Sequence, residues 1–157
     1  MKGLLPPGIH SMSAKDFVRL TCFNISRCDL YNIALKELAN FLAKNHIANV
    51  FVDGSYLEEK EYPNDIDAFF EMTEEQYNDL FVIFSDDSFS RWHDDLKNIY
   101  SVDAYPSIIG RTNVKNQGRQ FETEKDYWLW KFGTSKDNHE KGIAYLKTTD
   151  ILMETPS

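Results

Sequence analysis

A Gly-Ser pair followed, nine residues later, by an Asp-Ile-Asp triplet constrains this chain more than any other part of its sequence. Gly54 and Ser55 end one apolar run, and Asp65–Asp67 open a second one. Two such runs predict neighbouring strands joined by a loop. Because residues two apart on a strand project from the same face, Asp65 and Asp67 are expected to point together while Ile66 turns toward a core.

The chemistry of these residues suggests a phosphate and metal site. Two adjacent carboxylates repel each other unless a cation or a proton lies between them. Gly54 lets the backbone approach a phosphate closely, and Ser55 offers a hydroxyl and an N–H group. A purely structural alternative stays open, because Gly-Ser is also a common turn and Asn64-Asp65 after Pro63 also fits turn chemistry.

A third carboxylate is expected on a neighbouring strand. Asp103 stands between Val102 and Ala104 in a β-prone stretch, which Pro106 ends or pushes to the edge of a sheet. Asp103 is therefore the candidate third metal ligand. The alternative is an aspartate that belongs to an edge strand or a turn and has no part in chemistry.

Composition narrows the class of protein. At 157 residues, the chain is long enough for one domain with a sizeable core, here residues 1–157. The net charge of −8 argues against broad nucleic-acid binding, which depends on an excess of Lys and Arg. No transmembrane stretch or export leader is visible, and the two cysteines are too few for a disulfide framework. We therefore expect a cytoplasmic protein with no membrane partner.

The order of the expected elements predicts an α+β fold, with a small mixed β-sheet packed by helices on one side. The helix expected near 29–45 has the clearest apolar face, and Thr73 with Gln76 forms a capping box. Aromatic residues in 123–132 are expected to belong to the core. The expected elements are an extended lead-in over 1–12, a helix from Ser13 through Leu20, a helix over 29–45, strands near 48–53 and 65–72, a helix from Thr73 through Phe84, a helix over 87–97, the Asp103 strand, a helix over 123–132, a strand over 141–146 and a flexible tail over 150–157.

A basic, glycine-containing loop over 110–119 stands out in this acidic chain. It carries Arg111, Lys115 and Arg119 and no acidic residue. A functional interpretation gives these cations a phosphate or an acceptor to contact, facing the carboxylates. A plain solvated loop is the alternative.

Three blocks together resemble a family of small, standalone nucleotidyltransferase-like proteins of bacteria and phages. They are Leu5–His10, the segment from Val52 through Asp67, and Lys141–Ile143. The resemblance implies the polymerase-β-like nucleotidyltransferase fold. It implies that Gly54 and Ser55 lie at a triphosphate and that Asp65, Asp67 and, less directly, Asp103 hold the metal.

We therefore expect a nucleotidyltransferase that uses Mg²⁺ or Mn²⁺ to move a nucleoside monophosphate from an NTP to an acceptor hydroxyl. Arg111, Lys115, Arg119 or Lys141 would balance the charge of the leaving pyrophosphate. The acidic net charge favours a protein or small-molecule acceptor over an RNA end, in a toxin–antitoxin or phage–host conflict setting. The alternative is an inactive, nucleotide-binding or interaction protein of the same fold, such as an antitoxin or anti-defence factor that acts on a protein partner.

Overall fold

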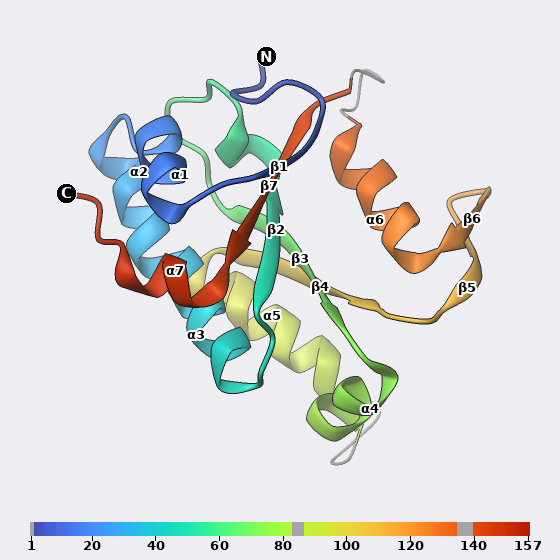
Figure 1. The fold of residues 1–157 in the computed structure, drawn as a ribbon. Helices are drawn as coiled ribbons and strands as arrows, with labels where there is room; N and C mark the ends of the chain where they lie inside the picture. Colours follow the sequence, from blue (N-terminus) through green and yellow to red (C-terminus); the bar gives the residue numbers. More distant parts are fainter. Residues whose placement is uncertain (1, 83–86, 135–139) are drawn as a thin grey trace.

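A five-stranded mixed sheet forms the centre of the molecule in a computed structural model, which describes residues 2–82, 87–134 and 140–157 (Figure 1). In spatial order its strands are β1 (Gly8–Ser11), β7 (Gly142–Lys147), β2 (Asn49–Asp53), β3 (Ile66–Met72) and β4 (Val102–Ile108). Strand β2 runs antiparallel to both of its neighbours, whereas β1 pairs in parallel with β7 and β3 in parallel with β4. The expected mixed sheet and the α+β class are thus confirmed.

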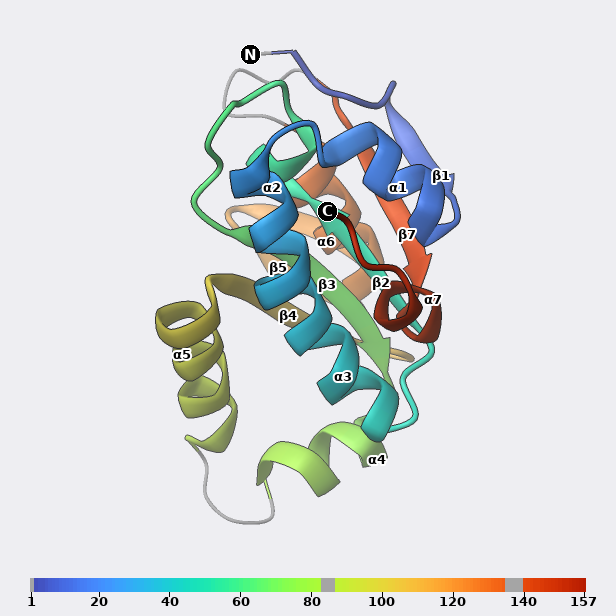
Figure 2. The same cartoon turned by 90° about the vertical axis from the view of Figure 1, so that its left-hand side faces the viewer.

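Most helices cover one face of this sheet, where the larger core lies (Figure 2). A continuous helical segment runs through α2, η1 and α3, and its middle turn is a π-helix. This segment starts at Ile25 behind an Asn24 cap, one turn earlier than the sequence pattern indicated. The elements on this face include α1 (Ala14–Thr21), α2 (Ile25–Leu30), η1 (Tyr31–Leu35), α3 (Lys36–Lys44), the 3₁₀ turn η2 (Gly54–Leu57), α5 (Ser88–Tyr100) and α7 (Thr148–Met153).

The opposite face is covered as well, which corrects the expectation of helices on one side only. Helix α6 (Glu124–Gly133) lies across it, and its Trp128 joins Phe51 and Phe69 of the sheet in a second core (Figure 1). The aromatic run of this helix is therefore core, as expected.

The segment expected as a basic loop is instead a β-hairpin beside α6. It consists of β5 (Thr112–Asn116) and β6 (Arg119–Thr123), and the turn between them has two residues with positive φ, Gln117 and Gly118. Such a turn suits a two-residue hairpin connection.

Capping residues set the starts of several helices as the sequence indicated. The Ser13 side chain accepts a hydrogen bond from the N–H of Asp16, and Thr73 and Gln76 form the expected capping box. That box starts α4 (Glu74–Tyr77), which continues into the π-helical turn η3 (Asn78–Val82). The expected end of this helix at Phe84 lies outside the described residues.

Both ends of the chain are more structured than the sequence suggested. The lead-in contributes the edge strand β1. The expected tail begins inside α7, where Ile151 is buried and its carbonyl accepts a hydrogen bond from the Tyr31 hydroxyl at 2.9 Å. The last residues also contact the body of the protein, because the Asn32 amide donates to the carbonyl of Pro156.

Candidate functional site

Four aspartates gather at one end of the sheet, on the face that α6 covers. The strand register places Asp53 of β2 opposite Asp67 of β3, and Asp67 opposite Asp103 of β4. The three side chains share the face of Phe51 and Phe69, since residues two apart on a strand point the same way. Asp65 stands one residue before β3 and adds a fourth carboxylate. We call these four residues the carboxylate cluster.

Asp53 is the most deeply placed member of the carboxylate cluster. Only 1% of it is exposed, and neither carboxylate oxygen has a hydrogen-bond partner in the described part of the chain. Burial, and then the charge of Asp67, raise the pKa of Asp53 well above its ordinary value. The ionised form of Asp53 is therefore disfavoured relative to its protonated form in the folded protein.

The same two causes act on its neighbours. Burial, followed by the charges of Asp65 and Asp103, raises the pKa of Asp67 to about 7. Burial and then Asp103 also raise the pKa of Asp65, against the opposing charges of Lys97 and Lys60. The carboxylate cluster thus holds more negative charge than its own cations balance.

Gly54 lies directly against this cluster. Its φ of +75° is left-handed, and a Cβ atom built on it would collide with the Asp67 side chain, 2.8 Å from Cγ. Glycine is therefore required here both by the backbone and by the close approach of a carboxylate. Ser55 follows in the first turn of η2 and is partly exposed.

One buried arginine fixes the loop that follows Gly54 and Ser55. The Arg27 guanidinium is fully buried and donates six hydrogen bonds to backbone carbonyls. Its acceptors in the loop are residues 55, 56, 58 and 60, and the fifth is Thr21. Arg27 of α2 therefore makes most of the side-chain hydrogen bonds to this loop, and the Asn24 amide adds one to the carbonyl of Glu61 at 2.7 Å.

A histidine from α5 contacts the third expected acid. His93 Nε2 lies 2.6 Å from Asp103 Oδ1, and the His93 ring packs at 4.7 Å against Tyr105. Tyr105 in turn stacks on Trp128 of α6 at 4.9 Å. Asp103 is thus oriented by a side-chain partner, whereas Asp53 has none.

Of the four cations predicted from sequence, Lys141 reaches the carboxylate cluster. Its charge lowers the pKa of both Asp53 and Asp67, in opposition to the burial that raises them. Lys141 Nζ also lies 3.6 Å from a carboxylate oxygen of Glu58. The lysine stands just before β7, at the same end of the sheet as Asp53.

Arg111 has acidic partners beyond the far end of β3, which corrects the expectation that it faces the carboxylates. Arg111 pairs with Glu74 at 3.0 Å and with Glu124 at 3.6 Å, and Glu74 stands beyond the far end of β3. The Arg119 guanidinium lies 4.8 Å from the centre of the Trp130 ring. Lys115 is exposed on the same hairpin, in β5.

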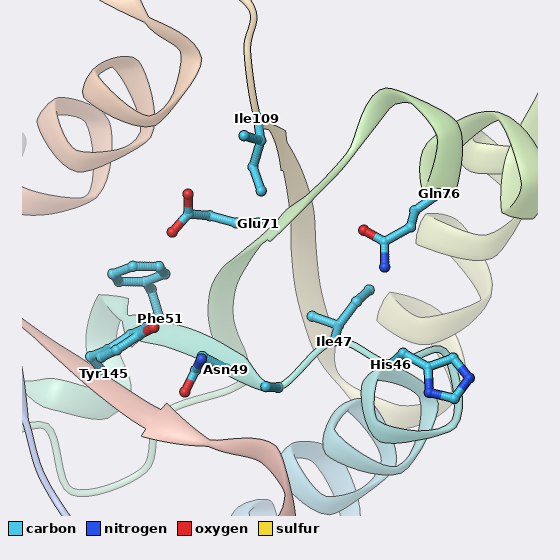
Figure 3. A pocket seen from close by; sticks show the side chains of 9 residues that line it. His46, Ile47, Asn49, Phe51, Glu71, Gln76, Ile109 and Tyr145 are labelled. Carbon is cyan, nitrogen blue, oxygen red and sulfur yellow. The ribbon is translucent and has the colours of Figure 1, made fainter.

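A separate cavity of about 300 Å³ opens at the other end of the same sheet (Figure 3). Gln76 and Ile47 point into it, and Asn49, Glu71 and Tyr145 line it (Figure 3). Glu71 is four residues beyond Asp67 on β3, or about 13 Å at the rise of a strand. The cavity is therefore distinct from the carboxylate cluster.

The residues predicted from sequence that the structure brings to one end of the sheet are Gly54, Ser55, Asp65, Asp67, Asp103 and Lys141. The residues that depend on tertiary contacts were not predicted. Asp53 carried a usable signal, because it precedes Gly54 at the end of an apolar strand and shares the face of Phe51. His93 carried none, since it lies in a polar stretch of the helix expected over 87–97. Arg27 carried none either, since it lies between the helices expected to end at Leu20 and to start at residue 29. Their roles appear only when α5 and α2 are packed on the sheet.

Over residues 2–82, 87–134 and 140–157, no three His, Cys, Asp or Glu side chains are arranged so that they could hold a metal ion as they stand. Nor does any helix in that part of the chain have the length and apolar character needed to cross a membrane.

Comparison with known proteins gives a family. A model described as "Family of unknown function (DUF6932)" matches residues 1–147, so the chain belongs to that family. No curated protein and no solved structure match significantly.

Proposed function

We propose that the protein is a nucleotidyltransferase of the polymerase-β-like fold, which transfers a nucleoside monophosphate from an NTP to an acceptor hydroxyl. The observation that carries this proposal is the convergence of the carboxylate cluster beside Gly54, at one end of one sheet face. An all-oxygen donor set of this kind suits Mg²⁺ or Mn²⁺. Such a cation supplies charge stabilisation at the phosphates and activates the attacking hydroxyl.

Different residues of the chain would bind the cation and the triphosphate. Asp65, Asp67 and Asp103 are the proposed cation ligands, and the proposal requires their side chains to close on the ion from their present positions. The Ser55 hydroxyl and adjacent N–H groups would hold the triphosphate, with Lys141 near the leaving pyrophosphate. In the transfer itself, the acceptor oxygen bonds to the α-phosphorus, the bond to the β-phosphate oxygen breaks, and a nearby carboxylate takes the hydroxyl proton.

Supporting features come from the loop and from Asp103. Arg27 holds the backbone between Ser55 and Lys60, so the Gly-Ser turn is presented in one conformation. Asp103 stands at the strand position of a third ligand, opposite Asp67 in the register of β3 and β4. Preorganised groups of this kind lower the cost of reaching the transition state.

A second candidate function is a nucleotide-binding or interaction protein without catalysis. The observation that favours it is the same His93–Asp103 contact, because it engages a carboxylate oxygen that a metal would otherwise use. Such a protein would act by contact with a partner, as an antitoxin or anti-defence factor does.

A labelling experiment separates the two. The pure protein is incubated with α-³²P-labelled NTPs, Mg²⁺ or Mn²⁺ and a cell lysate, and label on protein, RNA or small molecules is measured. We expect transfer by the parent and by Glu71→Gln, a change on the same strand outside the carboxylate cluster, and none by Asp67→Asn. If no nucleotide gives label with either cation, the enzymatic proposal fails and the binding function takes its place.

A further inference from the structure

Asp53 is the one acidic side chain that is buried in the described part of the chain. Two other fully buried polar side chains are satisfied: Arg27 donates to five carbonyls, and the Thr148 hydroxyl donates to the carbonyl of Ile47 at 3.0 Å. Among the described residues, single side-chain atoms of Asn32, Ser88 and Trp128 are also buried without a partner, but none of these atoms belongs to an ionisable group. Both oxygens of Asp53 lack such partners. A buried polar group without partners is unusual in a folded protein and calls for an explanation.

The position of Asp53 supplies one. Its register partner is Asp67, and it is followed at once by Gly54, which lies against the Asp67 carboxylate. A charge in this position is strongly disfavoured unless an opposite charge joins it. Among the described residues, Lys141 is the cation whose charge acts on Asp53, and Lys141 also lies 3.6 Å from Glu58.

We infer that Asp53 is a further ligand of the divalent cation, and that this cation binds before any nucleotide does. The inference rests on the proposed function, since it assigns Asp53 to the same metal centre as Asp65, Asp67 and Asp103. A cation between Asp53 and Asp67 relieves the repulsion of that pair and satisfies the unpartnered oxygens. Because the number of charged ligands sets the affinity of such sites, a fourth carboxylate permits binding without help from phosphate oxygens.

The order of binding gives Asp53 a role that differs from that of Asp103. Asp103 already has His93 as a partner, so it loses a hydrogen bond when it turns to a metal. Asp53 gives up no such bond. The cation would therefore bind first between β2 and β3 and would be completed from β4 when the nucleotide arrives.

The test is a Mn²⁺ titration of the full chain without nucleotide, in which electron paramagnetic resonance measures the concentration of free Mn²⁺. The parent is expected to bind Mn²⁺, and Asp53→Asn to bind it at least tenfold more weakly. Glu71→Gln is the matched control, because it removes a carboxylate from the same face of β3 and should leave Mn²⁺ affinity unchanged. Asp53→Leu repeats the test with an apolar side chain, in case the buried amide of Asp53→Asn impairs folding.

The outcomes separate this inference from the proposed function. Equal Mn²⁺ affinity of the parent and both Asp53 variants would overturn the inference and leave the metal centre of Asp65, Asp67 and Asp103 standing. Mn²⁺ binding by the parent only when an NTP is added would overturn the cation-first order. No Mn²⁺ binding by the parent, with or without NTP, would remove the metal centre and the inference together.

Discussion

Acidic residues lie at both ends of one sheet face, but they differ in whether they have charged partners. At the end that carries the cavity, Glu71 pairs with Lys125 at 3.3 Å, and Arg111 pairs with both Glu74 and Glu124. At the other end, Asp103 contacts His93 and Glu58 contacts Lys141, but Asp53, Asp65 and Asp67 form no ion pair with any described residue, and their pKa values are raised. Paired charges on a surface contribute little and are common, whereas unpaired acids held together in a buried place cost stability.

The presence or absence of a charged partner therefore indicates which acidic residues have a function beyond folding. At the cavity end, the ion pairs account for the presence of the acidic residues. Asp53, Asp65 and Asp67 repel one another, and this repulsion does not stabilise the fold. Clusters of this kind, with perturbed pKa values, are typical of binding and catalytic sites.

Arg27 should be the most sensitive residue near the carboxylate cluster. Arg27→Met leaves five backbone carbonyls without their buried donor, so we expect a loss of about 3–5 kcal/mol in the free energy of unfolding. Chemical denaturation measures it. The matched control is Arg19→Met, because Arg19 is largely exposed and meets Asp16 at 3.8 Å, and it should change stability by under about 0.5 kcal/mol. Equal effects of the two would show that Arg27 does not hold the loop.

Stability of the cation-free protein should fall as pH rises. Folding raises the pKa of Asp67 from 3.8 to about 7, so the folded state binds this proton more tightly than the unfolded state does. The resulting stabilisation is fully present below about pH 4 and is lost as pH rises through about 7, an effect of roughly 2–4 kcal/mol. Denaturation in EDTA at a series of pH values measures it, and Asp67→Asn should flatten the profile. A parent profile that Asp67→Asn leaves unchanged would show that the acid end carries no such strain.

Gly54 tests the close approach of Asp67. Gly54→Ala should cost about 3 kcal/mol, of which about 1–2 comes from the left-handed backbone and the rest from overlap with the Asp67 side chain. Gly118 is the matched control, because its φ of +74° equals that of Gly54 within a degree and a Cβ there meets nothing within 4 Å. Gly118→Ala should therefore cost the backbone part alone. The same loss at both glycines in thermal melts would mean that Asp67 does not fill the space beside Gly54.

The paired end should respond least. Arg111→Gln removes exposed ion pairs with Glu74 and Glu124, so we expect a loss of under about 1 kcal/mol and unchanged NTP binding. Lys141→Met, at the carboxylate end, should weaken NTP binding instead. Isothermal titration with an NTP and Mg²⁺ compares the two, and a stronger effect of Arg111→Gln would reverse the assignment of the ends.

Much of the fold followed from local signals. Side-chain caps at Ser13 and Thr73, the apolar runs of β2 and β3, and the Gly54 turn all depend on neighbours close in sequence. The hairpin over 112–123 and the edge strand β1 were not predicted, because short polar strands become strands through their pairing partners. Helix α6 covers the second face because Trp128 packs against Phe69, and the hydrophobic pattern of the sequence does not predict this contact.

The candidate site divides in the same way. Gly54, Ser55, Asp65 and Asp67 are linked by their spacing, and Asp103 by its strand. Asp53, His93 and Arg27 acquire meaning only from burial and from contacts over long sequence separations, such as the hydrogen bond from Arg27 to the carbonyl of Lys60. Charge alone was a poor guide to the cations, since Arg111 is held by acids at the other end of the sheet.

If the carboxylate cluster is a divalent cation site, the cation must stabilise the folded protein, and thermal melts measure that stabilisation. The parent and Asp67→Asn are melted in EDTA and again with excess Mn²⁺ or Mg²⁺. We expect the cation to stabilise the parent by about 2.7 kcal/mol at a hundredfold excess over Kd. Asp67→Asn should gain nothing from the cation while being at least as stable as the parent in EDTA. A parent that ignores both cations, with Asp67→Asn less stable by the same amount in every condition, would contradict the account.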